Sequence, residues 1–590
     1  NTAVGRYRPL YSNTTGGNNV AIGEQALYSN TTASNNTAVG YQAQYSGTTG
    51  TANTSLGYAA LKTNVSTSYN TAVGYAAMRD GNGGGDCAAF GFATLVSNTG
   101  QYNTALGSQS LYSNTSASYN VGIGYQSGYS NTTGASNTAI GTYALFSNTT
   151  ANSNTAVGYS ALYSTTAGGN TAMGQQAGYS NTTGNSFVSI GYQAMYFNTT
   201  GNESVAVGYQ AGHYNQTGNY NTWLGYSAGL GASGNSNSHN VGIGWGALNY
   251  VTTGTYNVAI GSQALRNNTS ANSNVGVGYG SLYSNTTGAT NVAVGFQAGY
   301  SGTTAGFNTF IGYQAGYQVG SSGGMVAVGY QSGFATGSSQ SVFVGTQAGY
   351  NATGSYNTFV GAQNSAGNGS GSAVTSGAKN TILGGYNGNQ GGLDIRTADN
   401  YIVLSDGDGN PRAWYNGASN YWLWTSPNNG GQNLVFDGAA FYPATDNAVK
   451  LGFSTAIRWS TVYAANGTIQ TSDRNLKQDI EDLSDAEKRV ATKAKSLIKK
   501  YRFIDAVEKK GDEARIHIGV IAQELEAAFA SEGLDAGKYG MFCFDDWYEV
   551  NGEMKDKDGA FYTKDSPNAV CKRRYAIRYE QLLAFVISAM

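Results

Sequence analysis

A unit of about 17 residues repeats along most of this chain, and it leaves few folds open. The unit reads Asn-Thr-Ala-Val-Gly-Tyr-Gln-Ala-Leu-Tyr-Ser-Asn-Thr-Thr-Gly and recurs, with small changes, from Asn1 to about Asn380. Its fifth residue is a glycine in copy after copy, as at Gly23, Gly40 and Gly57. One short unit cannot bury an apolar face alone, so copies must stack as successive coils. The repeat therefore predicts a β-solenoid.

Each unit contains residues that favour two short extended pieces. In Thr37-Ala38-Val39 the first and third side chains share one face, because strand side chains alternate, and we expect that face to point into the coil. Tyr41-Gln42-Ala43 predicts a second extended piece. Gly40 permits a turn that is closed to residues with a Cβ, and the Ser-Asn-Thr-Thr-Gly sequence is typical of turns.

Composition supports strands and excludes several classes of function. Of 590 residues, 85 are glycine and 45 are tyrosine, and only 11% are charged. Tyrosine, valine and threonine favour strands, and flexible linkers do not keep an apolar position in register with a fixed glycine. The net charge of −2 offers no basic surface for nucleic acid. No apolar run approaches the ~18 residues of a membrane span, so we expect no membrane insertion.

Cysteines and histidines are few and scattered. The spacing of Cys87, Cys543 and Cys571 does not fit a zinc site, and an odd number of cysteines cannot all form disulfides within one chain. We interpret them as unpaired thiols. His213 and His239 fall in repeat turns, where we expect them to be exposed. We expect no metal and no cofactor.

The pentads Asn-Thr-Ala-Val-Gly and Asn-Val-Ala-Ile-Gly resemble the repeats in the head domains of trimeric autotransporter adhesins, which are usually shorter. The resemblance implies a left-handed trimeric β-roll. Because the inner residues are few and small, one chain would have a thin core, and we expect three chains to share it. Residues 1–384 are therefore predicted to form a repetitive β-roll shaft.

Between residues 385 and 470 the repeat stops, and a β-rich knob is predicted. Short strands are expected at Ile402–Leu404, Tyr421–Trp424, Leu434–Phe436 and Trp459–Tyr463. Four tryptophans fall here, at Trp414, Trp422, Trp424 and Trp459. They form either a sugar-stacking platform or the core of the knob, and the core is the favoured interpretation.

One loop in the knob has the spacing that opens an EF-hand calcium site. Asp406-Gly407-Asp408-Gly409-Asn410 matches the first positions of that loop. Pro411 and Gly417 stand where the loop requires glycine and glutamate. A hairpin turn is therefore favoured over a calcium site.

Residues 471–590 are charged and mostly helical in pattern. Ser484-Asp485-Ala486-Glu487 is a capping box, which predicts a helix through about Lys500. Further elements are expected as a strand at Tyr501–Phe503, a second helix entered from Ile518–Leu525, a hairpin turn at Asp556–Gly559 and a final helix after Tyr575–Tyr579.

Three motifs in this last segment, in order, are Thr471–Lys477, Ile518–Glu524 and Tyr579–Leu583. Together they resemble the intramolecular chaperone auto-processing domain at the C-termini of phage endosialidases, tail spikes and neck fibres, and of some cellular proteins. The resemblance covers about the last fifth of the chain and implies that the domain trimerises the chain and then releases itself.

The resemblance also implies a chemistry for two residues. Ser472 is the expected nucleophile and Lys477 its general base, and they would cut the Thr471–Ser472 bond once per chain. A lysine acts as a base near neutral pH only if desolvation or another positive charge lowers its pKa. The candidate supporting residues are Asp473, Arg474, His517 and Gln523.

The whole sequence predicts a homotrimeric phage tail fibre. We expect it in the virion, outside the cell, after assembly in the host cytoplasm, with partners among other tail proteins and a host-surface carbohydrate or protein as receptor. The chaperone would fix the register of three repetitive chains, in which any repeat can pair with any other.

Two alternatives stay open. The first is a cellular secreted adhesin or glycosylated filament with the same chaperone, because sequons recur in the repeats, although turn composition explains them equally well. Sequons stand at Asn13, Asn30, Asn114, Asn131, Asn148 and Asn198. The second is a polysaccharide-degrading tail spike. It needs a pair of carboxylates, and the repeats are nearly devoid of them, so that part would have to precede Asn1.

Overall fold

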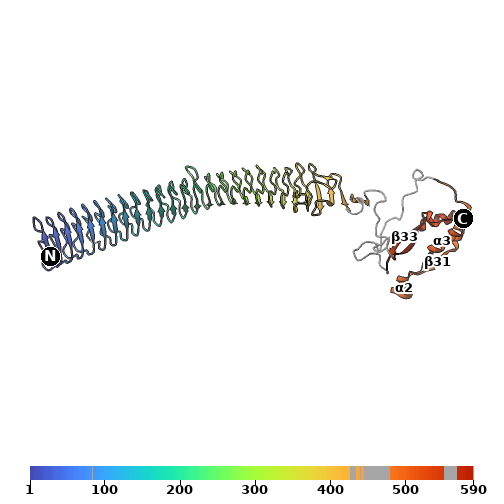
Figure 1. Ribbon diagram of the computed structural model, residues 1–590, viewed down its shortest axis with the longest axis horizontal. Helices are drawn as coiled ribbons and strands as arrows, with labels where there is room; N and C mark the ends of the chain where they lie inside the picture. Colours follow the sequence, from blue (N-terminus) through green and yellow to red (C-terminus); the bar gives the residue numbers. More distant parts are fainter. Residues whose placement is uncertain are drawn as a thin grey trace. The chain divides into compact units, whose positions relative to one another are not determined.

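The computed structural model describes residues 1–82, 84–335, 337–425, 433–438, 440–443, 479–550 and 568–588. They divide into two compact units, Asn1–Asp446 and Asn447–Met590. The first is a β-solenoid that ends in an antiparallel sheet, and the second carries the four α-helices of the described residues (Figure 1). The predicted fold class, a mainly β fibre with a helical C-terminal segment, is confirmed.

The solenoid is built from 23 strands of three residues each. Their bounds are β1 (Thr2–Val4), β2 (Val20–Ile22), β3 (Thr37–Val39), β4 (Thr54–Leu56), β5 (Thr71–Val73), β6 (Ala88–Phe90), β7 (Thr104–Leu106), β8 (Val121–Ile123), β9 (Thr138–Ile140), β10 (Thr155–Val157), β11 (Thr171–Met173), β12 (Val188–Ile190), β13 (Val205–Val207), β14 (Thr222–Leu224), β15 (Val241–Ile243), β16 (Val258–Ile260), β17 (Val275–Val277), β18 (Val292–Val294), β19 (Thr309–Ile311), β20 (Val326–Val328), β21 (Val342–Val344), β22 (Thr358–Val360) and β23 (Thr381–Leu383). Successive strands pair in parallel and in register, as Thr37 with Thr54, so equivalent residues form rows along the shaft.

The middle residue of each strand, not the outer two, points into the coil. Ala38 is fully buried, whereas Thr37 and Val39 are half-buried. The prediction that the first and third residues point inward is therefore wrong. The coil is too narrow for them: even at Gly122, another middle position, an added Cβ would lie 2.4 Å from the Ser110 hydroxyl oxygen.

The segment after the strand is a series of turns. The predicted extended piece at Tyr41–Ala43 is wrong, because Gln42 and Gln44 have left-handed φ angles of 50° and 49°. The predicted role of Gly40 holds. Its φ is +134°, and a Cβ there would lie 2.3 Å from the Gly57 carbonyl oxygen of the next coil. Only glycine tolerates both the dihedral angle and the contact.

Buried asparagines join the coils at the residue before most of the strands. The Oδ1 of Asn36 accepts a hydrogen bond from the backbone N–H of Asn53 at 2.9 Å. Its Nδ2 donates to the carbonyl of Gly50, also at 2.9 Å, and so joins the start of a coil to its end. A second row runs through the turns, where Asn131 donates to Asn114 and to the Gly134 carbonyl. These side chains satisfy backbone groups that no strand partner reaches.

Large aromatic side chains enter the core of several later coils. The middle residues of β1–β13 are alanine, serine or glycine, whereas Trp223, Phe310, Phe343 and Phe359 occupy that position later and are buried. Neighbouring glycines make the room. A Cβ on Gly229 would lie 2.2 Å from the Trp223 ring.

Aromatic rings stack in rows on the outside of the coils. Tyr41, Tyr58 and Tyr75 follow one another with ring centroids 5.1 and 4.9 Å apart. His213 continues such a row by stacking on Tyr196. It is 5% exposed, so the expectation that it lies in solvent is wrong; His239 is exposed, as expected. Burial lowers the pKa of His213.

The parallel rows continue into an antiparallel sheet. β26 pairs in parallel with β23, and then β26 to β30 follow one another as antiparallel neighbours. The bounds are β26 (Tyr401–Ser405), β27 (Pro411–Asn416), β28 (Tyr421–Thr425), β29 (Asn433–Phe436) and β30 (Phe441–Pro443), with a separate hairpin of β24 (Asn389–Gln390) and β25 (Leu393–Asp394). The three predicted knob strands among the described residues are confirmed, and the fourth, Trp459–Tyr463, lies outside them.

The second unit is a small α+β module. Its elements are α1 (Asp485–Ser496), β31 (Ile498–Tyr501), α2 (Ile504–Lys510), β32 (His517–Val520), α3 (Ala522–Ser531), β33 (Phe542–Glu549), β34 (Val570–Ile577) and α4 (Tyr579–Ile587), with 3₁₀ turns at Gly511–Glu513 and Ala536–Lys538. β31 pairs with β32, and β33 with β34, both antiparallel. Buried Val490, Phe529 and Phe585 bring α1, α3 and α4 together around one core.

The capping box that begins α1 is confirmed, with Ser484 and Glu487 bonded reciprocally. The predicted helix end near Lys500 is wrong, because α1 stops at Ser496 and the next residues form β31. Ile498, Lys499 and Lys500 pair with β32, and that pairing outweighs their helix propensity. The expected turn at Asp556–Gly559 lies outside the described residues, between β33 and β34.

Asn257 allows a direct test of the asparagine rows. It is fully buried, donates to the Ala271 carbonyl at 2.8 Å and accepts from the Asn274 N–H at 3.0 Å. Asn257→Ala leaves both groups unpaired, at a cost of about 1–3 kcal/mol each. We expect faster hydrogen exchange in peptides that cover the neighbouring coils. The control is Asn267→Ala, which changes a half-buried side chain in the same coil. Equal exchange in the two variants would contradict the role of the rows.

Candidate functional site

The expected nucleophile and base cannot be placed. Thr471, Ser472, Asp473, Arg474 and Lys477 all lie outside the described residues. Their arrangement therefore stays a prediction. The other two motifs of the terminal module, Ile518–Glu524 and Tyr579–Leu583, are described, and they meet in space.

Gly519 and Tyr579 form the contact between these two motifs. Gly519 lies on β32, and Tyr579 is the first residue of α4. A Cβ on Gly519 would lie 2.3 Å from the Tyr579 hydroxyl oxygen, so only glycine leaves room for the ring. The Tyr579 hydroxyl also donates to the Val520 carbonyl at 3.5 Å, which is a long hydrogen bond. This contact, between motifs 60 residues apart, was not predicted from the sequence.

Tyr501 completes this cluster from β31. Burial, and then the hydrogen bond with Tyr501, raise the pKa of Tyr579 above its ordinary value. His517 lies beside Tyr501 on the paired strand, with ring centroids 5.9 Å apart, and also contacts Phe503. His517 and Gln523 are both exposed. The geometry thus places His517 in an aromatic surface cluster, and a supporting role for either residue stays a prediction.

An apolar groove of about 190 Å³ lies beside the Gly519–Tyr579 contact. Side chains from α1, β31, β32 and α4 line it: Ala494, Ile498, Ile518, Val520, Leu582, Leu583 and Val586. Ile518 and Leu583 are 69% and 60% exposed. None of the described residues that line the groove is charged, and its exposed apolar side chains favour packing against another apolar surface.

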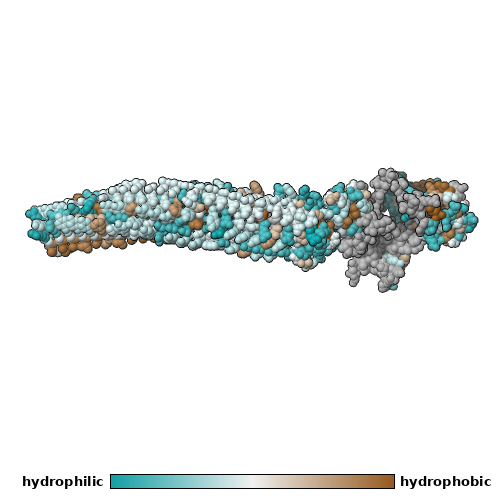
Figure 2. All heavy atoms as spheres, turned by 90° about the horizontal axis from the view of Figure 1, so that it is seen from above, coloured by the Kyte–Doolittle hydropathy of each residue, from teal (hydrophilic) through white to brown (hydrophobic). Residues whose placement is uncertain are grey.

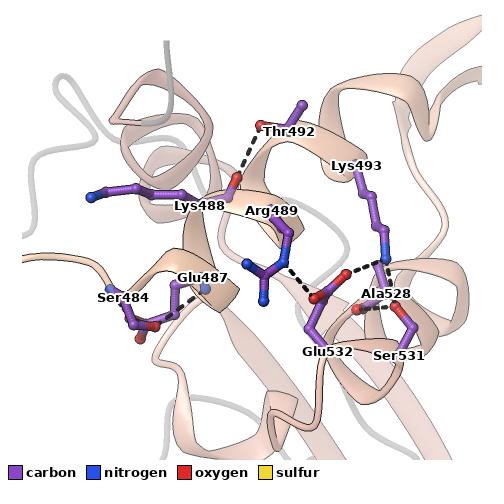
Figure 3. A network of polar contacts seen from close by, with 9 residues as sticks. All are labelled: Ser484, Glu487, Lys488, Arg489, Thr492, Lys493, Ala528, Ser531 and Glu532. Atoms are coloured by element: carbon purple, nitrogen blue, oxygen red, sulfur yellow. Dashed lines mark hydrogen bonds and ion pairs between the residues drawn. The ribbon is translucent and has the colours of Figure 1, made fainter.

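A network of ion pairs holds α1 against α3. Figure 3 shows Arg489 and Lys493 of α1 reaching the carboxylate of Glu532, with distances of 2.8 and 2.5 Å. Lys493 also donates to the Ser531 hydroxyl. Hydrogen bonds from Lys493 and Arg489 lower the pKa of Glu532. Glu532 follows the last residue of α3, and these bonds therefore fix the packing of the two helices.

The calcium-loop pattern forms a hairpin turn, as favoured from the sequence. The Asp406 carboxylate is bonded to the Arg412 guanidinium and accepts from the Asn410 N–H at 2.9 Å. Its oxygens are thus occupied by the protein itself. Among the described residues, no group of three or more histidine, cysteine, aspartate or glutamate side chains is placed to hold a metal ion. The same residues contain no helix that is long and apolar enough to span a membrane.

The side chains of Cys87 and Cys571 are described and both are free, in line with the predicted thiols. Cys87 replaces an asparagine of the buried row: it donates its N–H to Asn70, and its sulfur accepts from the Asn103 N–H at 3.4 Å. Burial raises the pKa of this thiol. Cys571 is exposed.

The sequon asparagines belong to the internal hydrogen-bond rows. Asn30 is fully buried, and its Nδ2 donates to Asn13 and to the Ala33 carbonyl. A glycan would replace one of the two hydrogens on this same nitrogen, so one of these two bonds would be lost. Asn114, Asn131, Asn148 and Asn198 are at most 2% exposed. The folded coils therefore do not favour the glycosylated filament.

The tryptophans of the knob have different surroundings. Trp414 packs against the solenoid core, Trp422 is half-buried, and Trp424 is 59% exposed. Trp459 lies outside the described residues. The core interpretation thus fits Trp414 and does not account for Trp424.

The chain matches one family model and is similar to several phage proteins. Residues 472–534 match the family model described as chaperone of endosialidase. The tail spike protein of Escherichia virus K5 is 32% identical over 152 residues, which cover 26% of this chain and 23% of that protein. The side tail fiber protein pb1 of Escherichia phage T5 is 33% identical over 150 residues, which cover 24% of this chain and 10% of that protein.

The chain spans less than a quarter of the length of these two relatives. A solved structure, the carboxy-terminal domain of the bacteriophage T5 L-shaped tail fiber with its intra-molecular chaperone domain, is 26% identical. The matched region covers 32% of this chain and 50% of the chain in that structure, with a TM-score of 0.24.

The Gly519–Tyr579 contact predicts a pair of variants. Gly519→Ala forces the Tyr579 ring away and should destabilise the terminal module by about 1–3 kcal/mol. Adding Tyr579→Phe removes the hydroxyl that the new Cβ meets first, so the double variant should recover part of the loss. Helical circular dichroism during heating measures the effect. An unchanged Tm for Gly519→Ala would show that the contact is not tight.

The N-terminus of α1 predicts an acid response. Hydrogen bonds from the Ser484 hydroxyl, and then from Tyr539, lower the pKa of Glu487 from its ordinary 4.5. The folded pKa is the lower one, so this stabilisation is complete above about pH 4.5 and is lost as the pH falls through the folded pKa. Tyr539 in turn has its pKa raised to about 12, first by burial and then by Glu487.

The Tm, measured by helical circular dichroism, should therefore fall less between pH 6 and pH 3 in Ser484→Ala than in the parent chain. Asp485→Asn is the matched control, because the Asp485 side chain is 91% exposed. It should keep the parent's pH dependence. Identical acid-induced losses in the parent and Ser484→Ala would refute the contribution of Glu487.

Proposed function

We propose that this chain is a phage tail fibre that assembles as a homotrimer under the direction of its C-terminal chaperone. The observation that carries the proposal is the match of residues 472–534 to the chaperone of endosialidase model, in a chain whose preceding residues form a long repetitive solenoid. Phage relatives named as tail spike and tail fiber proteins support the same assignment.

The repetitive shaft explains why a chaperone is needed. Successive strands carry nearly the same residues, so a displaced pairing between chains by one whole coil would cost little. Folding through many long-range pairings is also slow. A trimerising module at one end raises the effective concentration of three chains and sets a common starting point.

The proposed domain division is 1–384 for the shaft, 385–470 for the knob and 471–590 for the chaperone. The first serves as a structural rod. Host-surface carbohydrate or protein is the proposed receptor, and other tail proteins of the virion are the proposed partners. Assembly is proposed to take place in the host cytoplasm, before the fibre reaches the outside of the cell as part of the virion.

The proposed cleavage occurs once per chain. Neutral Lys477 takes the proton of the Ser472 hydroxyl, and the oxygen attacks the Thr471 carbonyl carbon. The Ser472 nitrogen leaves with a proton, so an ester replaces the amide. Water then hydrolyses the ester to a Thr471 carboxylate and a free Ser472 amine. Loss of the module removes the path back to the unfolded state and leaves the shaft kinetically trapped.

A denaturing gel tests the cleavage. The parent chain should give two bands, for residues 1–471 and 472–590, and Ser472→Ala should give one. Ser496→Ala, at the end of α1, is the control and should be cut like the parent. Lys477→Met should also abolish cutting, because it keeps the length of the side chain and removes the base. A single full-length band for the parent would contradict self-cleavage.

A further inference from the structure

The outward face of the solenoid strands is a continuous apolar surface. The third residue of each strand from β1 to β23 is Val, Ile, Leu, Met or Phe, and the first residue is Thr, Val or Ala. None of them is charged. Leu56, Leu106 and Leu224 are 47%, 49% and 45% exposed, and Figure 2 shows apolar residues gathered along one edge of the shaft near its N-terminal end.

This face continues past the last coil without changing side. The pairing register aligns Leu383 with Leu404, then Ala413, Trp424 and Leu434. A parallel row aligns Thr381 with Ile402, Tyr415, Trp422, Phe436 and Phe441. We call the two rows together, from β1 to β30, the outer strand face. Its last strands carry large aromatic side chains in place of Val and Thr.

Three aromatic side chains at the end of the outer strand face are exposed. Trp424 is 59% exposed, Phe441 56% and Phe436 47%. Soluble monomers rarely expose contiguous apolar patches above a few hundred Å². A surface that adds an apolar side chain with every coil exceeds that limit, so something must cover it in the working protein.

We propose that the outer strand face, including its aromatic end, packs against the same face of further copies of this chain. This inference rests on the proposed function, in which the fibre is a homotrimer. The shaft repeats its apolar side chain once per coil over 23 strands, and a partner must match that period along the whole length. A parallel second copy has the same rise per coil and matches it at every step. A sugar would cover only a short part of the face.

The aromatic end then has a role that the coils cannot perform. Val, Ile, Leu and Thr fill these rows at nearly every step, so most of the shaft permits two copies to shift by one coil. Trp424, Phe436 and Phe441 occur once per chain and fit only when the copies are aligned end to end. The exposed tryptophan therefore marks the register between copies rather than a receptor site.

Cross-linking tests the inference. Leu383→Cys places a thiol on the outer strand face, and Ser376→Cys places one in the turn of the preceding coil, where the residue is also exposed. Both are made in a Cys543→Ser, Cys571→Ser background, which leaves the buried Cys87 in place. A short bis-maleimide reagent should join chains of Leu383→Cys and not those of Ser376→Cys. Unchanged hydrogen exchange of the shaft confirms that each variant folds.

Trp424→Ala combined with Leu383→Cys tests the register role. This variant is cross-linked by direct disulfide formation rather than with the bis-maleimide. Copies that shift by one coil move their equivalent cysteines apart by roughly 4.8 Å, which a disulfide cannot span, so its yield should fall several-fold. If Trp424 instead bound sugar, Trp424→Ala would leave the yield unchanged and reduce retention on immobilised host polysaccharide, and the inference would be wrong.

The native mass, measured together with cross-linking, distinguishes an error in the proposed interface from an error in the proposed homotrimer. An oligomer that cross-links through Ser376→Cys and not through Leu383→Cys refutes the outer strand face and leaves the proposed function intact. A single-chain mass before and after cleavage refutes the homotrimer itself.

Discussion

The shaft depends on one hydrogen-bond arrangement, the buried asparagine that precedes most of the solenoid strands. A three-residue strand pairs few backbone groups, so the corners of a coil would otherwise hold unpaired N–H and C=O groups. The amide of Asn36 joins Asn53 of the next coil to Gly50 of its own. Because each amide connects neighbouring coils, the coils stabilise one another in sequence, as in other linear repeat proteins.

The same geometry makes the coil narrow and creates the need for partners. A narrow coil accepts Ala38 inside and leaves Val39 outside, so most of the branched apolar side chains stay on the surface. Phe343 and Phe359 enter the core of later coils, where Gly349 and Gly371 lie against their rings.

The repeat was enough to predict the solenoid, its period and the role of Gly40. Alternation in Thr37–Val39 could not tell which face is inside, because that depends on the width of the coil, a property of the stacked structure. The left-handed Gln42 was not predictable, since glutamine has no strong preference for that conformation. His213 sits where other units have tyrosine, and its burial follows from stacking on Tyr196. In the terminal module the sequence revealed the motifs, but not the contact of Gly519 with Tyr579, because it joins residues that only the folded chain brings together. The Ser472–Lys477 pair stays a prediction from resemblance.

The central claim is that one chain is only part of the shaft, because its outer strand face needs further copies. Mass per unit length of the purified fibre, measured by scanning transmission electron microscopy, tests this most directly. One coil of about 17 residues advances roughly 4.8 Å along the axis, which sets the value for a single chain. The account predicts three times that value along the whole shaft. The value of a single chain would contradict it.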